Sequence, residues 1–256
     1  MALNKLLDNN PAVEFNASSF IRDQKILIIV PAFNEEGHIF QTVQEICSRF
    51  PDCSVLIVND GSQDQTSFQA KRTDAFVVNL PFNLGIGGAV QTGFKFAYEN
   101  DYDIAVQVDG DGQHDVTYLN DLLMPVISEE ADMTIGSRFL PPFLGYRSSF
   151  IRRIGIHFFA YLISLISEYK VTDPTSGFRA YNRKMIKVFS QYYPSDYPEP
   201  EAIVVAGRYR AQIKEIPVQM RKRTTGHSSI RYLNTLYYMI KVTIAILLDR
   251  LKKVKK

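Results

Sequence analysis

Short apolar runs and amphipathic stretches alternate along most of this 256-residue chain, and this alternation constrains its fold more than any other feature. The apolar runs predict strands, and the stretches between them have the period of helices. Strands are expected near residues 25–30, 54–58, 75–79, 103–108, 132–136, 177–181 and 213–220. Helices are expected near residues 36–49, 64–72, 86–99, 116–129, 151–168, 183–191, 199–210 and 231–251. Strand and helix in turn predict an α/β fold, whose mostly parallel sheet is covered on both faces and binds ligands beyond the carboxyl ends of its strands.

Two aspartates separated by one glycine follow the strand expected at 103–108. Side chains alternate in direction along a strand, so Asp109 and Asp111 can face the same way where the strand opens into a loop. Carboxylate oxygens suit Mg²⁺ or Mn²⁺, and these ions suit a diphosphate. An acidic turn with two solvated aspartates is the plainer interpretation of such a motif in isolation. Further motifs along the chain favour the metal site.

Four other segments carry polar residues at expected strand ends or helix starts. They are Pro31-Ala32-Phe33-Asn34-Glu35-Glu36, the segment 58–66, Asn83-Leu84-Gly85-Ile86-Gly87-Gly88-Ala89 and the segment 173–181. In this order, with the two aspartates, they resemble the family 2 glycosyltransferases with a GT-A fold, most closely the branch of dolichyl- and polyprenyl-phosphate sugar synthases. The resemblance covers roughly residues 25–231. It implies a Rossmann-like mixed sheet flanked by helices.

The resemblance also implies a pocket for a UDP- or GDP-linked sugar. It assigns Asp60 to the base or ribose, and it assigns Pro31, Phe33 and Glu35 or Glu36 to the opposite wall. An Asx-turn is the structural alternative for Asp60. Many relatives carry Asp-Asp-Gly-Ser, whereas this chain has Asn59 before Asp60.

For the metal, the ligand candidates are Asp109 and Asp111, and the family places the residue at Gln113 near the ion. Mg²⁺ or Mn²⁺ would neutralise the departing nucleoside diphosphate. His114 is interpreted as a satisfied loop histidine rather than as a base or ligand. The glycine-rich segment 83–88 either contacts phosphate at a helix start or packs closely against neighbouring backbone, and the sequence does not decide between these roles.

A basic segment after the last expected strand resembles the R-x-x-G-x-S loop that closes over the donor diphosphate in this family. Arg223 and Ser228 are its candidate donor contacts, since basic and hydroxyl side chains suit phosphate oxygens.

The acceptor decides which catalytic groups are needed. A phosphate monoester is already anionic and needs cations to position it, whereas a hydroxyl needs a general base. In polyprenyl-phosphate synthases, arginines that match Arg138 and one of Arg152 and Arg153 hold the acceptor phosphate. Arg179 is interpreted as a structural or loop-anchoring residue.

The rival mechanism uses a carboxylate base near the start of the helix at 199–210. Glu199 and Glu201 lie there, and Glu201 is also expected in the polyprenyl-phosphate branch, so its presence does not discriminate between the two acceptors. The structural alternative is that both glutamates favourably occupy a helix N-terminus.

The C-terminal residues are apolar on a helical period and then basic. Lys241, Arg250, Lys252, Lys253, Lys255 and Lys256 lie in the last sixteen residues against Asp249 alone. The segment 232–256 is too interrupted for a transmembrane span, so it is expected to be an amphipathic helix that either lies at an anionic membrane surface or packs on the core. Residues 1–24 are expected to form a loose arm, and residues 25–231 the catalytic domain.

The remaining composition places few further limits. The net charge of +2 gives no indication of nucleic acid as a partner. Cys47 and Cys53 form no disulfide framework or zinc spacing, which favours a reducing cytosol, and the N-terminus does not resemble a signal peptide.

These observations predict an inverting, metal-dependent enzyme that moves a sugar from a nucleotide diphosphate to a lipid-borne acceptor, most simply a polyprenyl phosphate, at the inner face of the cell membrane. The membrane surface is an expected partner, and a small membrane protein is a further candidate. Two alternatives stay open: transfer to a sugar hydroxyl of a surface glycan with Glu199 or Glu201 as base, and a non-catalytic subunit that binds sugar nucleotide or lipid.

Overall fold

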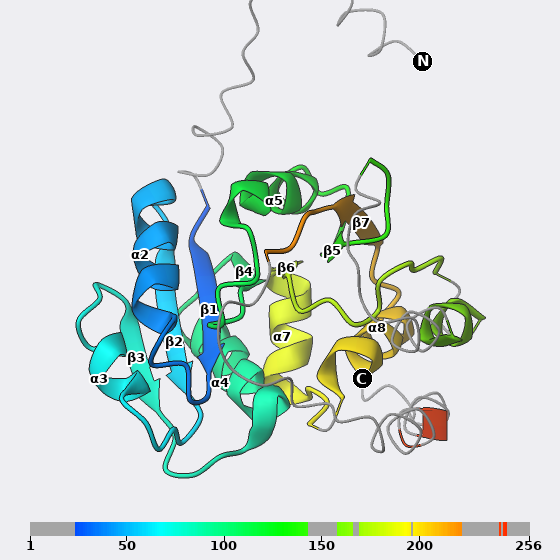
Figure 1. Cartoon of the computed structure of the whole chain (residues 1–256). Helices are drawn as coiled ribbons and strands as arrows, with labels where there is room; N and C mark the ends of the chain where they lie inside the picture. Colours follow the sequence, from blue (N-terminus) through cyan, green and yellow to red (C-terminus); the bar gives the residue numbers. More distant parts are fainter. Residues whose placement is uncertain are drawn as a thin grey trace, which may run out of the picture.

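The computed structural model of the protein describes residues 24–142, 158–165, 169–195, 197–221, 241, 243 and 244. These residues form one central sheet with helices packed on both of its faces (Figure 1). Within this part of the chain, no helix is long and apolar enough to cross a membrane.

Seven strands form the sheet, in the order β3-β2-β1-β4-β6-β5-β7. The strands are β1 Ile26–Ala32, β2 Ser54–Asn59, β3 Phe76–Asn79, β4 Ile104–Gln107, β5 Met133–Ser137, β6 Arg179–Asn182 and β7 Ile213–Pro217. The first four strands are parallel to one another, and β5 is parallel to β7, whereas β6 runs antiparallel to both of its neighbours. The predicted mostly parallel, mixed sheet is therefore confirmed.

The helices divide between the two faces. They are α2 Ile39–Arg49, α3 Thr66–Ala70, α4 Gly85–Glu99, α5 Leu119–Ile127, α7 Arg183–Gln191 and α8 Pro198–Arg208, with a 3₁₀ turn at Val116–Tyr118. One buried apolar cluster contains residues of α4, α7 and α8, and the other contains residues of α2, α3 and α5. Alternate residues of β1 enter the two clusters, with Leu27 in the first and Ile28 in the second. A strand covered on both faces explains why β1 is a continuous apolar run.

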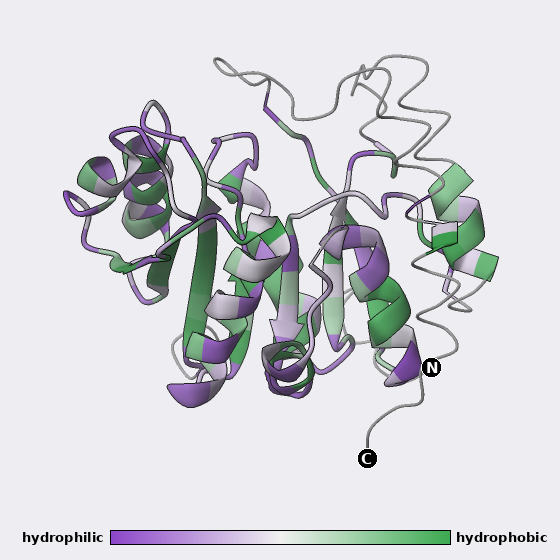
Figure 2. Ribbon diagram, turned by 90° about the horizontal axis from the view of Figure 1, so that it is seen from below, coloured by the Kyte–Doolittle hydropathy of each residue, from purple (hydrophilic) through white to green (hydrophobic). Residues whose placement is uncertain are grey.

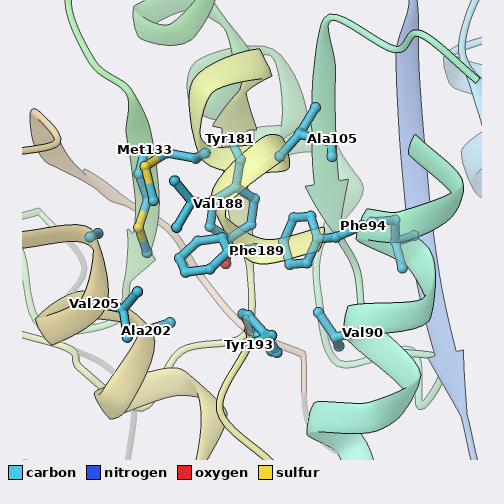
Figure 3. Packing of buried hydrophobic residues seen from close by; sticks show 14 of the residues in the cluster. Val90, Phe94, Ala105, Met133, Tyr181, Val188, Phe189, Tyr193, Ala202 and Val205 are labelled. Atoms are coloured by element: carbon cyan, nitrogen blue, oxygen red, sulfur yellow. The ribbon is translucent and has the colours of Figure 1, made fainter. Parts of the chain in front are cut away.

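Four aromatic rings form the centre of the first cluster (Figure 3). The ring centroid of Phe94 in α4 lies 5.0 Å from that of Tyr181 in β6, 5.3 Å from that of Phe189 in α7 and 5.2 Å from that of Tyr193. These contacts fix α4 and α7 against the sheet. They also hold the chain after α7 near the first turn of α4, where a Cβ on Gly87 would lie 2.2 Å from the carbonyl oxygen of Pro194.

Hydrophobic residues dominate the strands at the centre of Figure 2, and the loops around them are largely hydrophilic. All seven expected strands are present, and the expected helices within the described residues are confirmed, including residues 158–165 of the one expected at 151–168. The helix expected near 231–251 lies almost wholly outside the described residues, as does the arm expected at 1–24, of which only Gln24 is described.

Candidate active site

The polar segments that follow β1, β2 and β4 meet at one edge of the sheet. Ala32 is paired with Asn59 at the ends of β1 and β2, and Ile29 is paired with Gln107 at the end of β4. Beyond β4 the N–H of Gly110 donates to the carbonyl of Pro31 at 3.2 Å. The aspartate loop therefore runs beside the end of β1, next to the predicted donor-binding residues.

The two loops of the predicted donor side are joined by hydrogen bonds. The N–H groups of Asn34, Glu35 and Glu36 each donate to a side chain of the segment 62–66. In return the carboxylate of Glu36 accepts from the N–H of Gln65 at 2.8 Å. The Glu36 carboxylate thus holds the loops together, whereas the ring of Phe33 is 45% exposed at their surface. Pro31 is buried at the end of β1.

Asp60 connects these loops to the start of α4. Its side chain is buried, and Oδ1 accepts from the N–H of Leu84 at 2.7 Å. This bond spans 24 residues, so Asp60 is not closing a local Asx-turn in this way. Gly61 has φ +65°, and a Cβ there would lie 2.7 Å from the backbone nitrogen of Asn83. The backbone at Phe82 and Asn83 therefore packs closely against Gly61.

The hydrogen bonds of Asn59 explain why this position holds an amide, whereas many relatives carry an aspartate there. It is buried, its Nδ2 donates to Oδ1 of Asn79 at 2.8 Å, and its Oδ1 accepts from the N–H of Ser62 at 3.3 Å. An amide both donates and accepts, whereas an ionised carboxylate accepts only. Asn59 therefore ties β2 to β3 and to the donor loop.

Asp109 and Asp111 lie in a tight loop, each with part of its surface exposed. Oδ1 of Asp109 accepts from Nε2 of Gln107 at 3.2 Å, and Oδ1 of Asp111 accepts from the N–H of Gln113 at 3.0 Å. The Asp109 carboxylate is thus oriented by the last residue of β4, and the Asp111 carboxylate by a neighbour in its own loop. We call residues 109–115 the metal loop.

The two carboxylates fit a hard divalent cation. Among the described residues, no three His, Cys, Asp or Glu side chains converge on one point. Two carboxylates are sufficient for Mg²⁺, because this ion keeps several waters and takes further ligands from substrate phosphates. The side-chain amide of Gln113 contacts a different group, since its Nε2 donates to the carbonyl oxygen of Arg221 at 3.5 Å. Contact between Gln113 and an ion therefore stays a prediction.

His114 is buried beneath the metal loop. Its Nδ1 accepts from the N–H of Asp109 at 3.0 Å, so Nε2 carries the proton, and it lies 3.5 Å from Oδ2 of Asp109. The imidazole stacks on Phe178 at 4.9 Å between centroids. This geometry agrees with the interpretation of His114 as a satisfied loop histidine.

The segment 173–179 lies against the other side of Asp109. A Cβ on Gly177 would lie 3.0 Å from Oδ2 of Asp109, so only a glycine fits there without displacement. Arg179 is fully buried, and its guanidinium donates to the carbonyls of Ser176 at 2.6 Å and Pro174 at 3.0 Å. Arg179 therefore anchors this loop, as expected.

Arg138 follows β5 and forms a buried ion pair that the sequence did not predict. Its Nε and Nη2 donate to the carboxylate of Asp173 at 2.6 and 2.7 Å, and Nη2 donates to Oγ1 of Thr175 at 2.8 Å. Arg138 is 6% exposed and Asp173 is 0% exposed. The structure thus shows Arg138 holding the 173–179 loop, and its contact with an acceptor phosphate stays a prediction.

Glu199 and Glu201 lie in the first turn of α8, as their helix-terminus interpretation requires. Glu201 is buried, and Glu199 is half-buried. Burial raises the pKa of Glu199 against the opposing charge of Arg179, and the charge of Asp109 raises it further. The Glu199 carboxyl is therefore within electrostatic range of the metal loop.

Four candidate residues, Arg152, Arg153, Arg223 and Ser228, lie outside the described residues. The sequence interpretation missed roles for Asn59, Asp173 and Gly177. Asp173 and Gly177 belong to a segment that the family resemblance includes. Their partners, Arg138 and Asp109, are distant in sequence, so the pattern did not indicate these contacts.

Comparisons with known proteins identify the family of the chain. Glycosyl transferase family 2 matches residues 27–189. The UDP-N-acetylglucosamine–dolichyl-phosphate N-acetylglucosaminyltransferase of Methanococcus voltae is 30% identical over 216 residues, covering 77% of this chain and 86% of that protein. The undecaprenyl-phosphate mannosyltransferase of Micrococcus luteus is 28% identical over 221 residues, covering 80% and 87%.

A solved structure shows the same fold. Glucosyl-3-phosphoglycerate synthase from Mycobacterium tuberculosis, in complex with Mn²⁺, uridine diphosphate and phosphoglyceric acid, has a TM-score of 0.69 and 21% identity, covering 94% of this chain and 83% of that one.

Proposed function

This chain belongs to glycosyl transferase family 2, and from that membership we propose that it moves a hexose-type sugar from a UDP- or GDP-linked donor to a polyprenyl phosphate. The names of the two relatives above, which act on dolichyl phosphate and undecaprenyl phosphate, support this acceptor. The donor would lie across the edge of the sheet, between Asp60 and the metal loop. Transfer would invert the configuration of the anomeric carbon.

The observation that carries the proposal is the position of Asp109 between the donor loops and the 173–179 loop. The hydrogen bond from Gly110 to Pro31 connects the metal loop to the donor loops, and the close approach of Gly177 connects Asp109 to the 173–179 loop.

In the reaction, an acceptor phosphate oxygen forms a bond to the anomeric carbon. The bond from that carbon to the diphosphate breaks, and the nucleoside diphosphate leaves with the electron pair. The acceptor is anionic near neutral pH, so no base is required.

The remaining roles follow from charge. Arg138 and one of Arg152 and Arg153 would bind the acceptor phosphate, and Arg223 and Ser228 would bind the donor diphosphate. Asp109 and Asp111, with Gln113 nearby, would hold Mg²⁺ or Mn²⁺, which when bound neutralises charge on the leaving group. We propose that the reaction takes place at the cell membrane, because the acceptor is a lipid, and at its inner face, because Cys47 and Cys53 favour a reducing cytosol. The comparisons give no support for a small membrane protein partner, and the proposal does not include one.

The test is a transfer assay with a panel of UDP- and GDP-sugars and a polyprenyl phosphate, with the lipid product identified by mass and its anomeric configuration by NMR. We expect one donor to give a glycosyl phosphate lipid, and excess chelator to stop its formation. Formation of product at an unchanged rate in chelator would contradict the metal assignment. Absence of product with every donor would contradict the acceptor assignment.

Transfer to a sugar hydroxyl is the second candidate, favoured by the raised pKa of Glu199. A base must be deprotonated to act, so this activity should rise as pH increases through the raised pKa of Glu199. Glu199→Gln should abolish that rise. The non-catalytic alternative is not proposed, because Asp60, Asp109 and Asp111 are all present.

A further inference from the structure

Arg221 makes an ion-pair network at the edge of the metal loop. Its Nη1 and Nη2 donate to the two carboxylate oxygens of Glu45 in α2 at 2.6 and 2.7 Å, and Nη2 donates to Oδ1 of Asp115 at 2.9 Å. We call Arg221, Glu45 and Asp115 the Arg221 clamp. Its bidentate geometry is the strong form of an arginine–carboxylate contact.

The backbone reinforces the same junction. The N–H of Arg221 donates to the carbonyl of Gln113 at 2.8 Å, and Met220 forms an antiparallel bridge with His114. The chain that leaves β7 is thus paired with the metal loop, and the Arg221 side chain fastens that pairing to α2. Three parts of the sequence therefore meet here: α2, the metal loop and the chain after β7. Of these, only the metal loop carries candidate metal ligands.

We propose that Arg221 is a positioning residue that holds Asp111 and Gln113 in place for the divalent cation and the donor diphosphate. This inference rests on the proposed function. The path is short: the Arg221 guanidinium is bonded to Asp115 of the metal loop, and the Arg221 N–H is bonded to the carbonyl of Gln113, whose own N–H is bonded to the Asp111 carboxylate. Removing outer groups that orient metal ligands typically changes metal affinity by about 10- to 100-fold.

A purely structural role would give a different result. Ion pairs with exposed partners contribute little to stability, and the Arg221 side chain is 39% exposed. Arg221→Gln should therefore leave the thermal midpoint nearly unchanged while weakening cation binding. The matched control is Arg49→Gln, because Arg49 also contacts Glu45, at 3.4 Å, in a pair that lies within α2.

The experiment measures calorimetric binding of UDP with and without Mn²⁺ in the full-length protein, together with the donor KM and kcat. We expect Arg221→Gln to weaken Mn²⁺-dependent UDP binding by about 10-fold, and Arg49→Gln to stay within about 2-fold of wild type. Arg221→Lys should recover part of the affinity, because it keeps the charge but not the two-pronged contact. The double variant Glu45→Gln with Arg221→Gln should be no worse than Arg221→Gln alone.

Equal Mn²⁺-dependent UDP affinity in Arg221→Gln and Arg49→Gln would overturn the inference, as would UDP binding by wild type that does not respond to Mn²⁺. Neither binding measurement uses an acceptor. A failure of lipid transfer is therefore distinguishable from a failure of the Arg221 assignment.

Discussion

At the scale of single residues, Asp111 provides the most direct test of the metal site. Asp111→Asn removes one ligand charge from a partly exposed loop and disturbs no core residue. We expect sugar transfer to fall by a factor on the order of 10² or more, because charge stabilisation at the leaving diphosphate is lost. The free energy of unfolding should change by less than about 0.5 kcal/mol. Initial transfer rates and urea denaturation measure the two effects.

The control for this change is Asp121→Asn, which removes a carboxylate from the exposed surface of α5. It should transfer sugar at the wild-type rate. Turnover of Asp111→Asn equal to that of Asp121→Asn would remove Asp111 from the metal site.

Gly177 gives a second prediction at this scale. A Cβ in Gly177→Ala would lie 3.0 Å from both Oδ2 of Asp109 and Nε2 of Gln107. The Asp109 carboxylate must then move by a few tenths of an ångström, and we expect transfer to fall by about 10-fold, since misplacement of about 1 Å can cost 10²-fold. Kinetics at saturating acceptor, with circular dichroism as the check on folding, measure this. Unchanged kinetics would mean that the position of Asp109 is not critical.

Residues whose role depends on neighbours in sequence could be predicted, and residues whose role depends on distant partners could not. Asp109 and Asp111 follow a strand directly, so their place at the sheet edge followed from the pattern. The partner of Arg138 is Asp173, 35 residues away, and no spacing in the sequence indicates that contact. Arg221 and Glu45 are separated by 176 residues.

At the scale of elements, the ion pair between Arg138 and Asp173 joins the end of β5 to the 173–179 loop. Arg138→Ala leaves the Asp173 carboxylate buried without its guanidinium, which costs about 3–5 kcal/mol when one partner of a buried pair is removed. We expect this loss in urea denaturation. In the protein that remains folded, the acceptor KM should rise more than the donor KM.

Asp173→Ala separates the two effects, because it breaks the same pair and keeps the cation. If Arg138 contacts the acceptor, the acceptor KM should rise much more in Arg138→Ala than in Asp173→Ala. A weaker donor affinity with an unchanged acceptor KM in Arg138→Ala would place Arg138 on the donor side instead.

Element boundaries moved where side chains or strand partners intervened. The helix expected at 36–49 begins at Ile39, because Glu35 and Glu36 are occupied by bonds to the segment 62–66. The strand expected at 213–220 ends at Pro217, where its pairing with Ser137 of β5 ends. The helix expected at 116–129 opens with a 3₁₀ turn, in which the N–H of Thr117 donates to the side chain of Asp115. Apolar periodicity indicates the existence of an element, and local polar contacts decide where it begins and ends.

At the scale of the whole molecule, the Arg221 clamp joins α2, the metal loop and the chain that leaves β7, and it adds a small pH-dependent contribution to stability. The hydrogen bonds from Arg221 lower the pKa of Glu45 below its ordinary value near 4.5. A lowered pKa in the folded state contributes stability above pH 4.5, and this contribution is lost as pH falls through the folded value. Denaturation between pH 3 and pH 7 should therefore show a smaller loss of stability at low pH in Glu45→Gln than in wild type. Parallel curves would contradict this origin.

The last prediction concerns how the enzyme meets a lipid acceptor, and it depends on the C-terminal residues 232–256, most of which lie outside the described part of the chain. Their sequence ends in Lys252, Lys253, Lys255 and Lys256. Basic residues at an anionic surface contribute up to about 1 kcal/mol each, and less as salt screens them. Glutamine at these four positions should lower co-sedimentation with anionic vesicles and slow transfer to a long-chain polyprenyl phosphate.

Transfer to a short-chain, water-soluble acceptor phosphate should be unchanged in this variant, because that acceptor needs no membrane. The matched control replaces four exposed lysines elsewhere, which are Lys71, Lys95, Lys170 and Lys187. It removes the same charge, so a specific role for the C-terminus requires that vesicle binding fall in the first variant and not in the second. If vesicle binding is equal in wild type and both variants and does not respond to salt, the segment packs on the domain. That result would favour a glycan hydroxyl over a polyprenyl phosphate as the acceptor.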